Sequence, residues 1–200
     1  MIVGLGSGDT AARAIRLLGA RQLEIVAVAT SERSAALARS VGIVVRAPDD
    51  VAAIDITIDG ADELDDQLRI IKGGGAAHTR EKLVAQASRQ LIIVADRGKR
   101  VRRLGEHMPL PVELLPFGAA WTMARLRKLD LTPTPRAGLV SDNGNLIVDC
   151  PIAAGRDVRD LAAAIKALPG VVEHGFFLDE ASIAYVGTAD GVERLERPER

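Results

Sequence analysis

The chain has 200 residues, of which 48% are hydrophobic, which is enough apolar sequence to bury the core of one large domain or two small ones. Its 26 Lys and Arg side chains nearly balance 27 Asp and Glu side chains, so no long-range field favours nucleic acid or an anionic membrane as a partner. The single cysteine, Cys150, excludes an intrachain disulfide. With no metal-ligand spacing, signal-peptide pattern or membrane-length apolar run, the sequence favours a soluble, cytoplasmic protein.

The first half of the chain alternates apolar runs with helical patterns. Helical patterns at 11–19, 31–40 and 79–88 separate apolar runs at 2–5, 23–28, 43–45, 54–58 and 91–95. The run at 91–95 is continuously apolar, as in a central parallel strand that is covered on both faces. This βαβ rhythm predicts an α/β fold with a Rossmann-like, doubly wound parallel sheet.

The second half follows a different pattern. Pro109, Pro111 and Pro116 interrupt the chain and indicate a crossing between substructures. Helical patterns then alternate with short apolar runs at 138–140, 146–150, 171–178 and 182–186, and Asn143-Gly144 is a hairpin signal. We expect a smaller, ferredoxin-like α+β domain over 116–185, with 1–115 and 186–200 forming the larger catalytic domain, and we expect the charged end 194–200 to fray.

Two glycine-containing loops are candidate ligand sites. The loop Gly6-Ser7-Gly8-Asp9-Thr10 lies between a strand and a helix, where backbone N–H groups and the positive helix end suit a phosphate. A tight turn with Asp9 as the helix N-cap is the structural alternative. In Lys72-Gly73-Gly74-Gly75, three glycines cost chain entropy and gain no packing, so the loop suits close approach of backbone to a ligand. Lys72 would supply a cation for a phosphate or a developing oxyanion, and a flexible hairpin tip is the alternative.

Asp59 and Asp62 bracket Gly60-Ala61 at the point where a strand should end. In open α/β sheets, ligands bind beyond the carboxyl ends of the strands. Two carboxylates three residues apart in a turn could share a substrate's hydroxyls and move protons between them. A solvated acidic turn remains the alternative.

Glu81 is the candidate general base. It falls in the first turn of the helix expected over 79–88, where the dipole favours an ionised carboxylate. An ordinary first-turn acid, paired with Arg80 or Lys82, has the same pattern. Lys99 follows the strand at 91–95, where it could bind an anion or remain an exposed surface lysine.

The motifs occur in a fixed order over nearly the whole chain. They are VGLGSGDTAA (3–12), DGADELDDQLRIIKGGGAAHTREKLVA (59–85), ADRGK (95–99), LGEHMPLPVELLPFG (104–118), DNGNLIVD (142–149) and VGTADGV (186–192). In this combination the chain resembles the type A family of ribose-5-phosphate isomerases. DGADE, KGGGAA..REK and PLPVE together are far more specific than any one glycine loop.

The resemblance implies interconversion of D-ribose 5-phosphate and D-ribulose 5-phosphate, the aldose-ketose step of the non-oxidative pentose phosphate pathway, with no metal or organic cofactor. Glu81 matches the family's base, which moves a proton between C2 and C1 through a cis-enediolate. Asp59 and Asp62 match carboxylates that hold sugar hydroxyls and assist ring opening, and Lys72 matches a group that steadies the enediolate. The implied substrate-binding residues are Ser7, Gly8, Asp9, Thr10, Gly60, Ala61, Gly73, Gly74, Gly75 and Lys99. Members are usually homodimers or homotetramers.

The sequence departs from the family pattern at Asp9, where a small hydroxyl residue is usual. If the carboxylate points inward, at roughly 4 Å from a phosphate dianion, repulsion should weaken binding by about tenfold or more. If it turns away as a cap, little is lost. The family also usually has a helix ahead of the first strand, and this sequence begins almost at that strand.

Two other functions stay open. A catalytically weakened sugar-phosphate sensor is one, because the sugar-binding domain of DeoR-type repressors resembles this fold. An isomerase for another sugar is the other, and Asp9 is the main reason to consider it. A pure sensor would have no need to keep Glu81 together with Asp59, Asp62, Lys72 and Lys99. The N-terminal DNA-binding module that such repressors carry is absent from this sequence. We therefore expect the isomerase.

Overall fold

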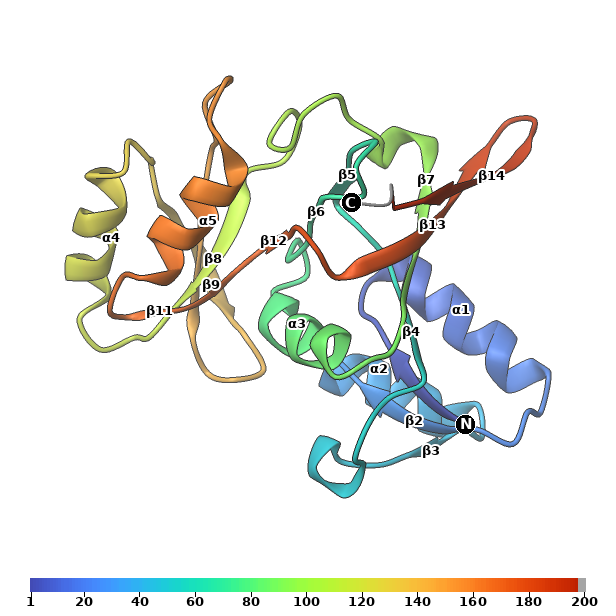
Figure 1. The fold of residues 1–200 in the computed structure, drawn as a ribbon. Helices are drawn as coiled ribbons and strands as arrows, with labels where there is room; N and C mark the ends of the chain where they lie inside the picture. The colour runs from blue at the N-terminus through green and yellow to red at the C-terminus, as the bar shows by residue number, and fades with distance from the viewer. Residues whose placement is uncertain (198–200) are drawn as a thin grey trace.

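The computed structural model describes residues 1–197, and its largest element is a seven-stranded sheet (Figure 1). The strand order is β14-β13-β7-β4-β1-β2-β3, and all neighbours are parallel except β13 and β14. The strands are β1 (Ile2–Leu5), β2 (Val26–Ala29), β3 (Val44–Val45), β4 (Ile56–Asp59), β7 (Leu91–Asp96), β13 (Ala181–Thr188) and β14 (Gly191–Glu196). This arrangement confirms the predicted α/β class with a largely parallel central sheet.

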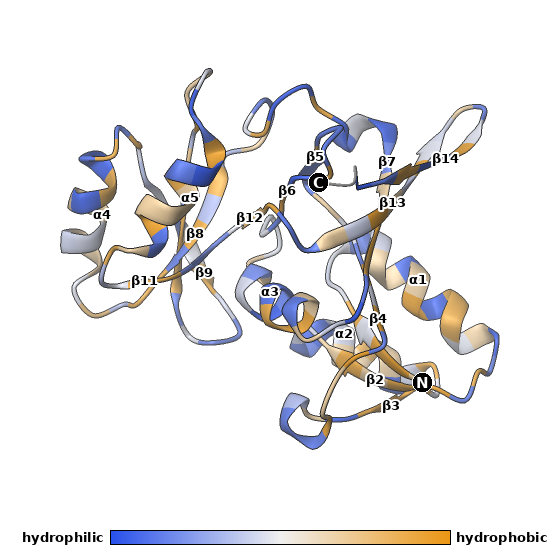
Figure 2. Ribbon diagram, in the orientation of Figure 1, coloured by the Kyte–Doolittle hydropathy of each residue, from blue (hydrophilic) through white to orange (hydrophobic). Residues whose placement is uncertain are grey.

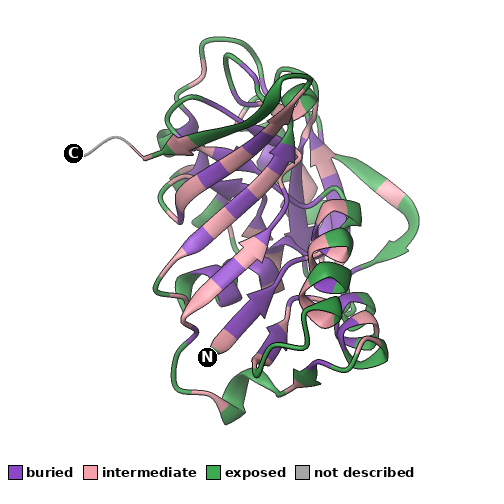
Figure 3. Ribbon diagram, turned by 90° about the vertical axis from the view of Figure 1, so that its right-hand side faces the viewer, coloured by how far each residue is buried: buried purple, intermediate pink, exposed green. Residues whose placement is uncertain are grey.

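Helices cover both faces of this sheet. α1 (Asp9–Ala20) and α2 (Glu32–Ser40) lie on one face, where Ile15 and Ala38 share a core with alternate residues of β1. α3 (His78–Gln86) lies on the other face, where Val84 packs with Val28. Figure 2 shows hydrophobic residues concentrated along the strands. Figure 3 shows buried and partly buried residues alternating along the central strands, while β14 is largely exposed. No helix within residues 1–197 is long and apolar enough to cross a membrane.

Two smaller sheets complete the fold. An antiparallel sheet of order β11-β8-β10-β9 lies with α4 (Ala119–Arg127) and α5 (Val158–Lys166) at one end of the molecule (Figure 1). Its strands are β8 (Leu110–Leu114), β9 (Thr134–Val140), β10 (Leu146–Cys150) and β11 (Val171–His174). Between the two ends, a three-stranded sheet joins β5 (Glu63–Leu64), β6 (Ile70–Ile71) and β12 (Phe176–Phe177). Short 3₁₀ turns form η1 (Pro48–Asp50) and η2 (Arg97–Lys99).

The sequence did not predict β8. All five of its residues are buried, and it runs through Pro111 in the middle of the small sheet. Proline cannot donate a ladder hydrogen bond, but the Pro111 carbonyl accepts one from Gly175 N at 2.8 Å. The hydrogen-bonded small sheet thus begins at Leu110, before the domain boundary expected at 115.

The expected fraying of 194–200 is wrong for its first residues. Arg194, Leu195 and Glu196 belong to β14, which pairs along its length with β13. The strand is largely exposed, so its charged residues can face solvent without breaking the ladder. Residues 198–200 lie outside the described residues.

Replacing Gly4 with Ala should lower the free energy of unfolding by about 1–3 kcal/mol. The added Cβ would lie 1.8 Å from Thr57 Oγ1 and 2.8 Å from Val84 Cγ1, so it would push α3 away from β1. Urea unfolding followed by circular dichroism measures the change.

Gly187→Ala is the matched control, because it lies in β13 and its added Cβ would meet nothing closer than 3.8 Å. Its free energy of unfolding should change by less than about 0.5 kcal/mol. Equal stability of the two variants would contradict the close packing of α3 on β1.

Candidate active site

A cavity of about 410 Å³ opens at the carboxyl-terminal edge of the large sheet. The segments that follow β1, β4 and β7 form three of its walls, and the glycine loop after β6 forms another. The structure brings together there nearly all the residues singled out in the sequence: Ser7, Gly8, Asp9, Thr10, Gly60, Ala61, Asp62, Lys72, Gly73, Gly74, Gly75, Glu81 and Lys99. Asp59 does not line the cavity and lies directly behind Lys72. A larger, mainly apolar cavity of about 640 Å³ between α2 and α3 contains none of these carboxylates.

Lys72 is the centre of the site. Its side chain is buried, and its ammonium lies 3.0 Å from Asp59 Oδ2 and 3.3 Å from Glu81 Oε1 and donates to the Gly60 carbonyl at 2.8 Å. Burial lowers the pKa of Lys72, but the charges of Asp59 and Glu81 more than offset this, and its pKa lies above the usual value. Lys72 is therefore a permanent cation with its three N–H groups engaged.

Asp59 is held from both sides at the end of β4. Its Oδ1 accepts from Gly60 N at 2.7 Å and from Ser7 N at 3.2 Å, while Oδ2 faces Lys72. Complete burial raises the pKa of Asp59, and Lys72 opposes that rise. A Cβ at Gly6 would lie 1.9 Å from Asp59 Oδ1, so only glycine at this position admits the carboxylate. Gly6 therefore shapes the carboxylate site as well as the loop.

Glu81 has the chemistry of a general base. It lies in the first turn of α3, as predicted, but it pairs with neither Arg80 nor Lys82, which bind Glu32 and Glu173 instead. Its Oε2 is buried and has no hydrogen-bond partner. Burial and then the charge of Asp59 raise the pKa of Glu81 to about 8, against the opposing effect of Lys72. A carboxyl with that pKa can take and return a proton near neutral pH.

The glycine loop is held in place and is not a flexible tip. Asp62 Oδ2 accepts from Gly74 N at 2.6 Å, and Gly73 has a φ of 108°, which favours glycine. Arg136 Nη1 donates to the carbonyls of Gly73 and Gly74, at 2.9 Å each, and its other nitrogens bind Asp149 at 2.7 and 2.8 Å. Sequence analysis missed Arg136, because no local pattern shows that strand β9 meets a loop some 60 residues earlier.

Asp9, at the end of the loop after β1, lines the cavity with a side chain that is exposed and paired with Arg33. The N-cap of α1 is Gly8, with a φ of 91° and no side-chain cap bond, so the structural alternative in which Asp9 caps the helix is wrong. Asp9 is the first residue of α1, and its side chain is 88% exposed and lies 3.5 Å from Arg33. Arg13, which the sequence analysis also missed, lies one turn further along α1 and lines the same wall. Lys99 lines the opposite side, in η2.

Comparison with known families and sequences gives one consistent result. Residues 26–191 match the family model described as ribose 5-phosphate isomerase A (phosphoriboisomerase A). The ribose-5-phosphate isomerase A of Thermomicrobium roseum is 50% identical over an alignment that covers 98% of this chain and 87% of that protein. The protein of the same name from Caulobacter sp. strain K31 is 48% identical, with coverage of 98% and 90%.

Solved structures agree with the sequence comparison. Ribose 5-phosphate isomerase A from Methanocaldococcus jannaschii superposes with a TM-score of 0.93 at 36% identity, covering 98% of this chain and 91% of that one. A D-ribose-5-phosphate isomerase in complex with phospho-erythronic acid superposes with a TM-score of 0.95 at 38% identity, with the same coverage.

The raised pKa of Glu81 should make stability depend on pH. The folded chain keeps the Glu81 proton up to about pH 8, whereas an unfolded glutamate loses it near 4.5. The contribution of this proton to the free energy of unfolding is fully present below about pH 4.5 and is lost as the pH rises through 8. Glu81→Gln is neutral at every pH. Relative to that variant, the wild type should lose on the order of 2–3 kcal/mol of unfolding free energy between about pH 6 and 9.

Urea unfolding of both proteins across this pH range measures the difference. A difference that stays constant with pH would show that Glu81 carries no proton in the folded state.

Proposed function

Because the chain belongs to the ribose 5-phosphate isomerase A family, we propose that it interconverts D-ribose 5-phosphate and D-ribulose 5-phosphate. The observation that carries this proposal is the buried Glu81 carboxylate, which keeps one oxygen without a partner beside the Lys72 ammonium. An aldose-ketose isomerase needs one base that removes a proton from carbon and returns it to the neighbouring carbon. Glu81 has the free oxygen, the burial and the pKa for both steps.

The proposed reaction moves one proton and one pair of electrons in each half. Glu81 takes the proton from C2 of the open-chain aldose, the C–H electrons form the C1–C2 double bond, and the carbonyl oxygen at C1 becomes an enediolate oxygen. Lys72 stabilises that negative charge, since a fixed cation in a site with little water interacts strongly with a developing oxyanion. The proton of the C2 hydroxyl then moves to the C1 oxygen, and Glu81 gives its own proton to C1 as the electrons of the C1–C2 double bond form the new C1–H bond. The C2 oxygen becomes the ketone and the C1 oxygen a hydroxyl.

Asp59 and Asp62 are proposed to act before this step. Asp62 faces the cavity and is held by Gly74 N, so we assign it to the sugar hydroxyls and to proton movement during ring opening. Asp59 lies behind Lys72, so we expect it to act mainly by fixing the position of the ammonium. The sugar phosphate would lie between the loop at Ser7 to Thr10 and Lys99, on the walls away from Glu81. The complex of a relative with phospho-erythronic acid supports a phosphorylated ligand for this chain.

Assembly, domain division and location remain parts of the proposal. We propose a homodimer or homotetramer in the cytoplasm, with a Rossmann-like domain over 1–115 and 186–200 and a ferredoxin-like domain over 116–185. Phe117 and Trp121 support assembly, because they are 86% and 70% exposed and meet edge to face, with ring centroids 6.5 Å apart. Exposed aromatic pairs of this kind are typical of interfaces.

Purified protein should convert ribose 5-phosphate to ribulose 5-phosphate, and EDTA should leave the rate unchanged, since every proposed step uses side chains. Glu81→Gln should lower kcat by about 10²- to 10⁴-fold, because it removes the base without changing the shape of the side chain. A coupled assay for the ketose measures both.

Glu106→Gln is the matched control, because the exposed Glu106 side chain accepts from Arg102 N at 3.0 Å on a loop outside the cavity. Its kcat should stay close to the wild-type value. A Glu81→Gln variant as active as the control would remove Glu81 from the mechanism, and an inactive wild type would leave a sugar-phosphate sensor as the better proposal.

Asp9→Ser should leave KM for ribose 5-phosphate within about twofold, because the Asp9 carboxylate is already exposed and turned towards Arg33. Lys99→Met should raise KM by about tenfold or more, because it removes a charged partner of the phosphate. Initial rates over a range of substrate concentrations measure both. A large fall in KM for Asp9→Ser would mean that the carboxylate does repel the substrate.

A further inference from the structure

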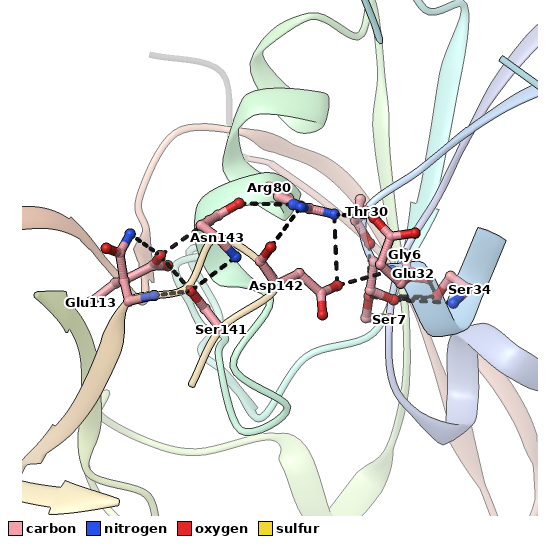
Figure 4. A network of polar contacts seen from close by, with 12 residues as sticks. Gly6, Ser7, Thr30, Glu32, Ser34, Arg80, Glu113, Ser141, Asp142 and Asn143 are labelled. Atoms are coloured by element: carbon pink, nitrogen blue, oxygen red, sulfur yellow. Dashed lines mark hydrogen bonds and ion pairs between the residues drawn. The ribbon is translucent and has the colours of Figure 1, made fainter. Parts of the chain in front are cut away.

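The turn 141–145, between β9 and β10, reaches from the small sheet to the beginnings of α2 and α3 (Figure 4). Its own backbone bonds fix its shape: Ser141 N donates to the Asn145 carbonyl at 2.9 Å, and Gly144 N donates to the Ser141 carbonyl at 2.8 Å. The turn therefore meets both helices as a preformed surface.

One side of the turn is fastened to Glu113, a buried carboxylate of β8. Its Oε1 accepts from Ser141 Oγ at 2.7 Å, from Asn145 Nδ2 at 2.8 Å and from Asn143 Nδ2 at 3.1 Å. Its Oε2 accepts from the hydroxyl of Thr79, in the first turn of α3. Burial raises the pKa of Glu113, but these side-chain donors lower it below the usual value. One ionised carboxylate thus binds the turn and α3 together.

Arg80, the residue before Glu81, makes the contacts on the other side. Its Nε donates to Asn143 Oδ1 at 2.8 Å, its Nη2 to the Asp142 carbonyl at 2.9 Å and its Nη1 to Glu32 Oε1 at 2.9 Å. Asp142 Oδ2 in turn accepts from Glu32 N at 2.9 Å, at the N-terminus of α2, where a negative charge is favourable. The rigid fork of one guanidinium joins three groups that a lysine could not reach together.

The beginning of α2 is also joined to the loop after β1. Ser7 Oγ donates to Ser31 Oγ, the N-cap of α2, at 2.9 Å, and Ser34 Oγ donates to the Gly6 carbonyl at 2.7 Å (Figure 4). The network around the turn 141–145 therefore touches both the helix that carries Glu81 and the loop proposed to hold the phosphate.

Glu81 depends on such support because its own contacts are few. Among residues 1–197, Oε2 has no hydrogen-bond partner, and the partner of Oε1 is Lys72. A carboxylate that must react cannot be held by many hydrogen bonds of its own, so the backbone of α3 has to orient it. The N-cap of α3, Ala77, makes no side-chain cap bond. Thr79 and Arg80 hold the first turn instead.

We propose that Arg80 is a positioning residue for the isomerisation. Its guanidinium holds the first turn of α3 against the turn 141–145 and so keeps the Glu81 carboxylate beside the Lys72 ammonium. The inference rests on the proposed role of Glu81 as the base. Arg80 does not line the cavity that contains Glu81, so it acts through the helix and not by touching the sugar.

Arg80→Met keeps the apolar part of the side chain and removes the guanidinium that makes the three hydrogen bonds. It should lower kcat by about 10- to 100-fold, with KM within about twofold, because a base displaced by a fraction of a bond length still leaves the binding loops in place. The acid limb of the pH profile of kcat should also move to lower pH. Water admitted beside Glu81 would weaken the burial that raises its pKa, while the charges that face it, Lys72, Asp59 and Asp62, remain.

Arg159→Met is the matched control. Arg159 makes a two-bonded ion pair with Asp179, at 2.7 and 2.9 Å, at the start of α5 and away from the cavity. Its loss should leave kcat, KM and the pH profile unchanged. Asn143→Ala removes the partner of Arg80 Nε from the side of the turn and should reproduce the loss of kcat. The double variant Arg80→Met/Asn143→Ala should lose less than the sum of the two single losses, because each single variant already removes the bond between Arg80 Nε and Asn143 Oδ1.

Amide hydrogen exchange over 79–84 separates this inference from the proposed function. Exchange should be faster in Arg80→Met than in Arg159→Met, whether or not the wild type converts ribose 5-phosphate. An inactive wild type would refute the proposed function alone. A folded Arg80→Met variant with unchanged kcat, pH profile and exchange would overturn the positioning role, as would a double variant whose losses simply add.

Discussion

The buried ammonium of Lys72 is the constraint on which the site depends. A charge removed from water costs several kcal/mol unless partners surround it, and here Asp59, Glu81 and the Gly60 carbonyl come from separate parts of the chain to do so. Burial, and after it the charge of Asp59, raises the pKa of Glu81 to about 8 against the opposing effect of Lys72. The same electrostatic cost that lowers stability above that pH makes Glu81 able to exchange a proton near neutrality.

Glycines at the start of the chain allow this cluster to form. Gly4 lets α3 approach the sheet, because any Cβ there would overlap Thr57 and Val84. Gly6 lets Asp59 approach the loop after β1. The two glycines therefore bring the helix of the base and the carboxylate behind Lys72 to the same edge of the sheet. The glycine pattern at the start of the chain looks like a phosphate-binding loop and nothing more. It also determines how closely Asp59 can approach that loop.

The central strands and the helices that cover them could be predicted from sequence. Burial on one or both faces gives each of these segments a hydrophobic pattern that is visible within the segment itself. β8 could not, since its residues are buried against segments distant in the sequence, among them α4 and α5, and its prolines indicated a break. β14 is an exposed edge strand, so its charged residues carry no apolar alternation. The carboxylates and Lys72 were found because they follow strand ends, whereas Arg136 acts across a tertiary contact that no local pattern records. Asp9 could be placed only once the backbone of the loop was known.

The small sheet takes part in the site through two contacts on different sides of Lys72. Arg136, fixed by its two bonds to Asp149, holds the carbonyls of the glycine loop, and the turn 141–145 holds the first turn of α3. Three glycines in a row would otherwise sample many conformations, and a base with a free oxygen has little of its own to fix it. Preorganised groups stabilise a transition state only if they do not have to move when charge develops. The two parts of the chain therefore have to act as one rigid unit for Lys72 and Glu81 to work together.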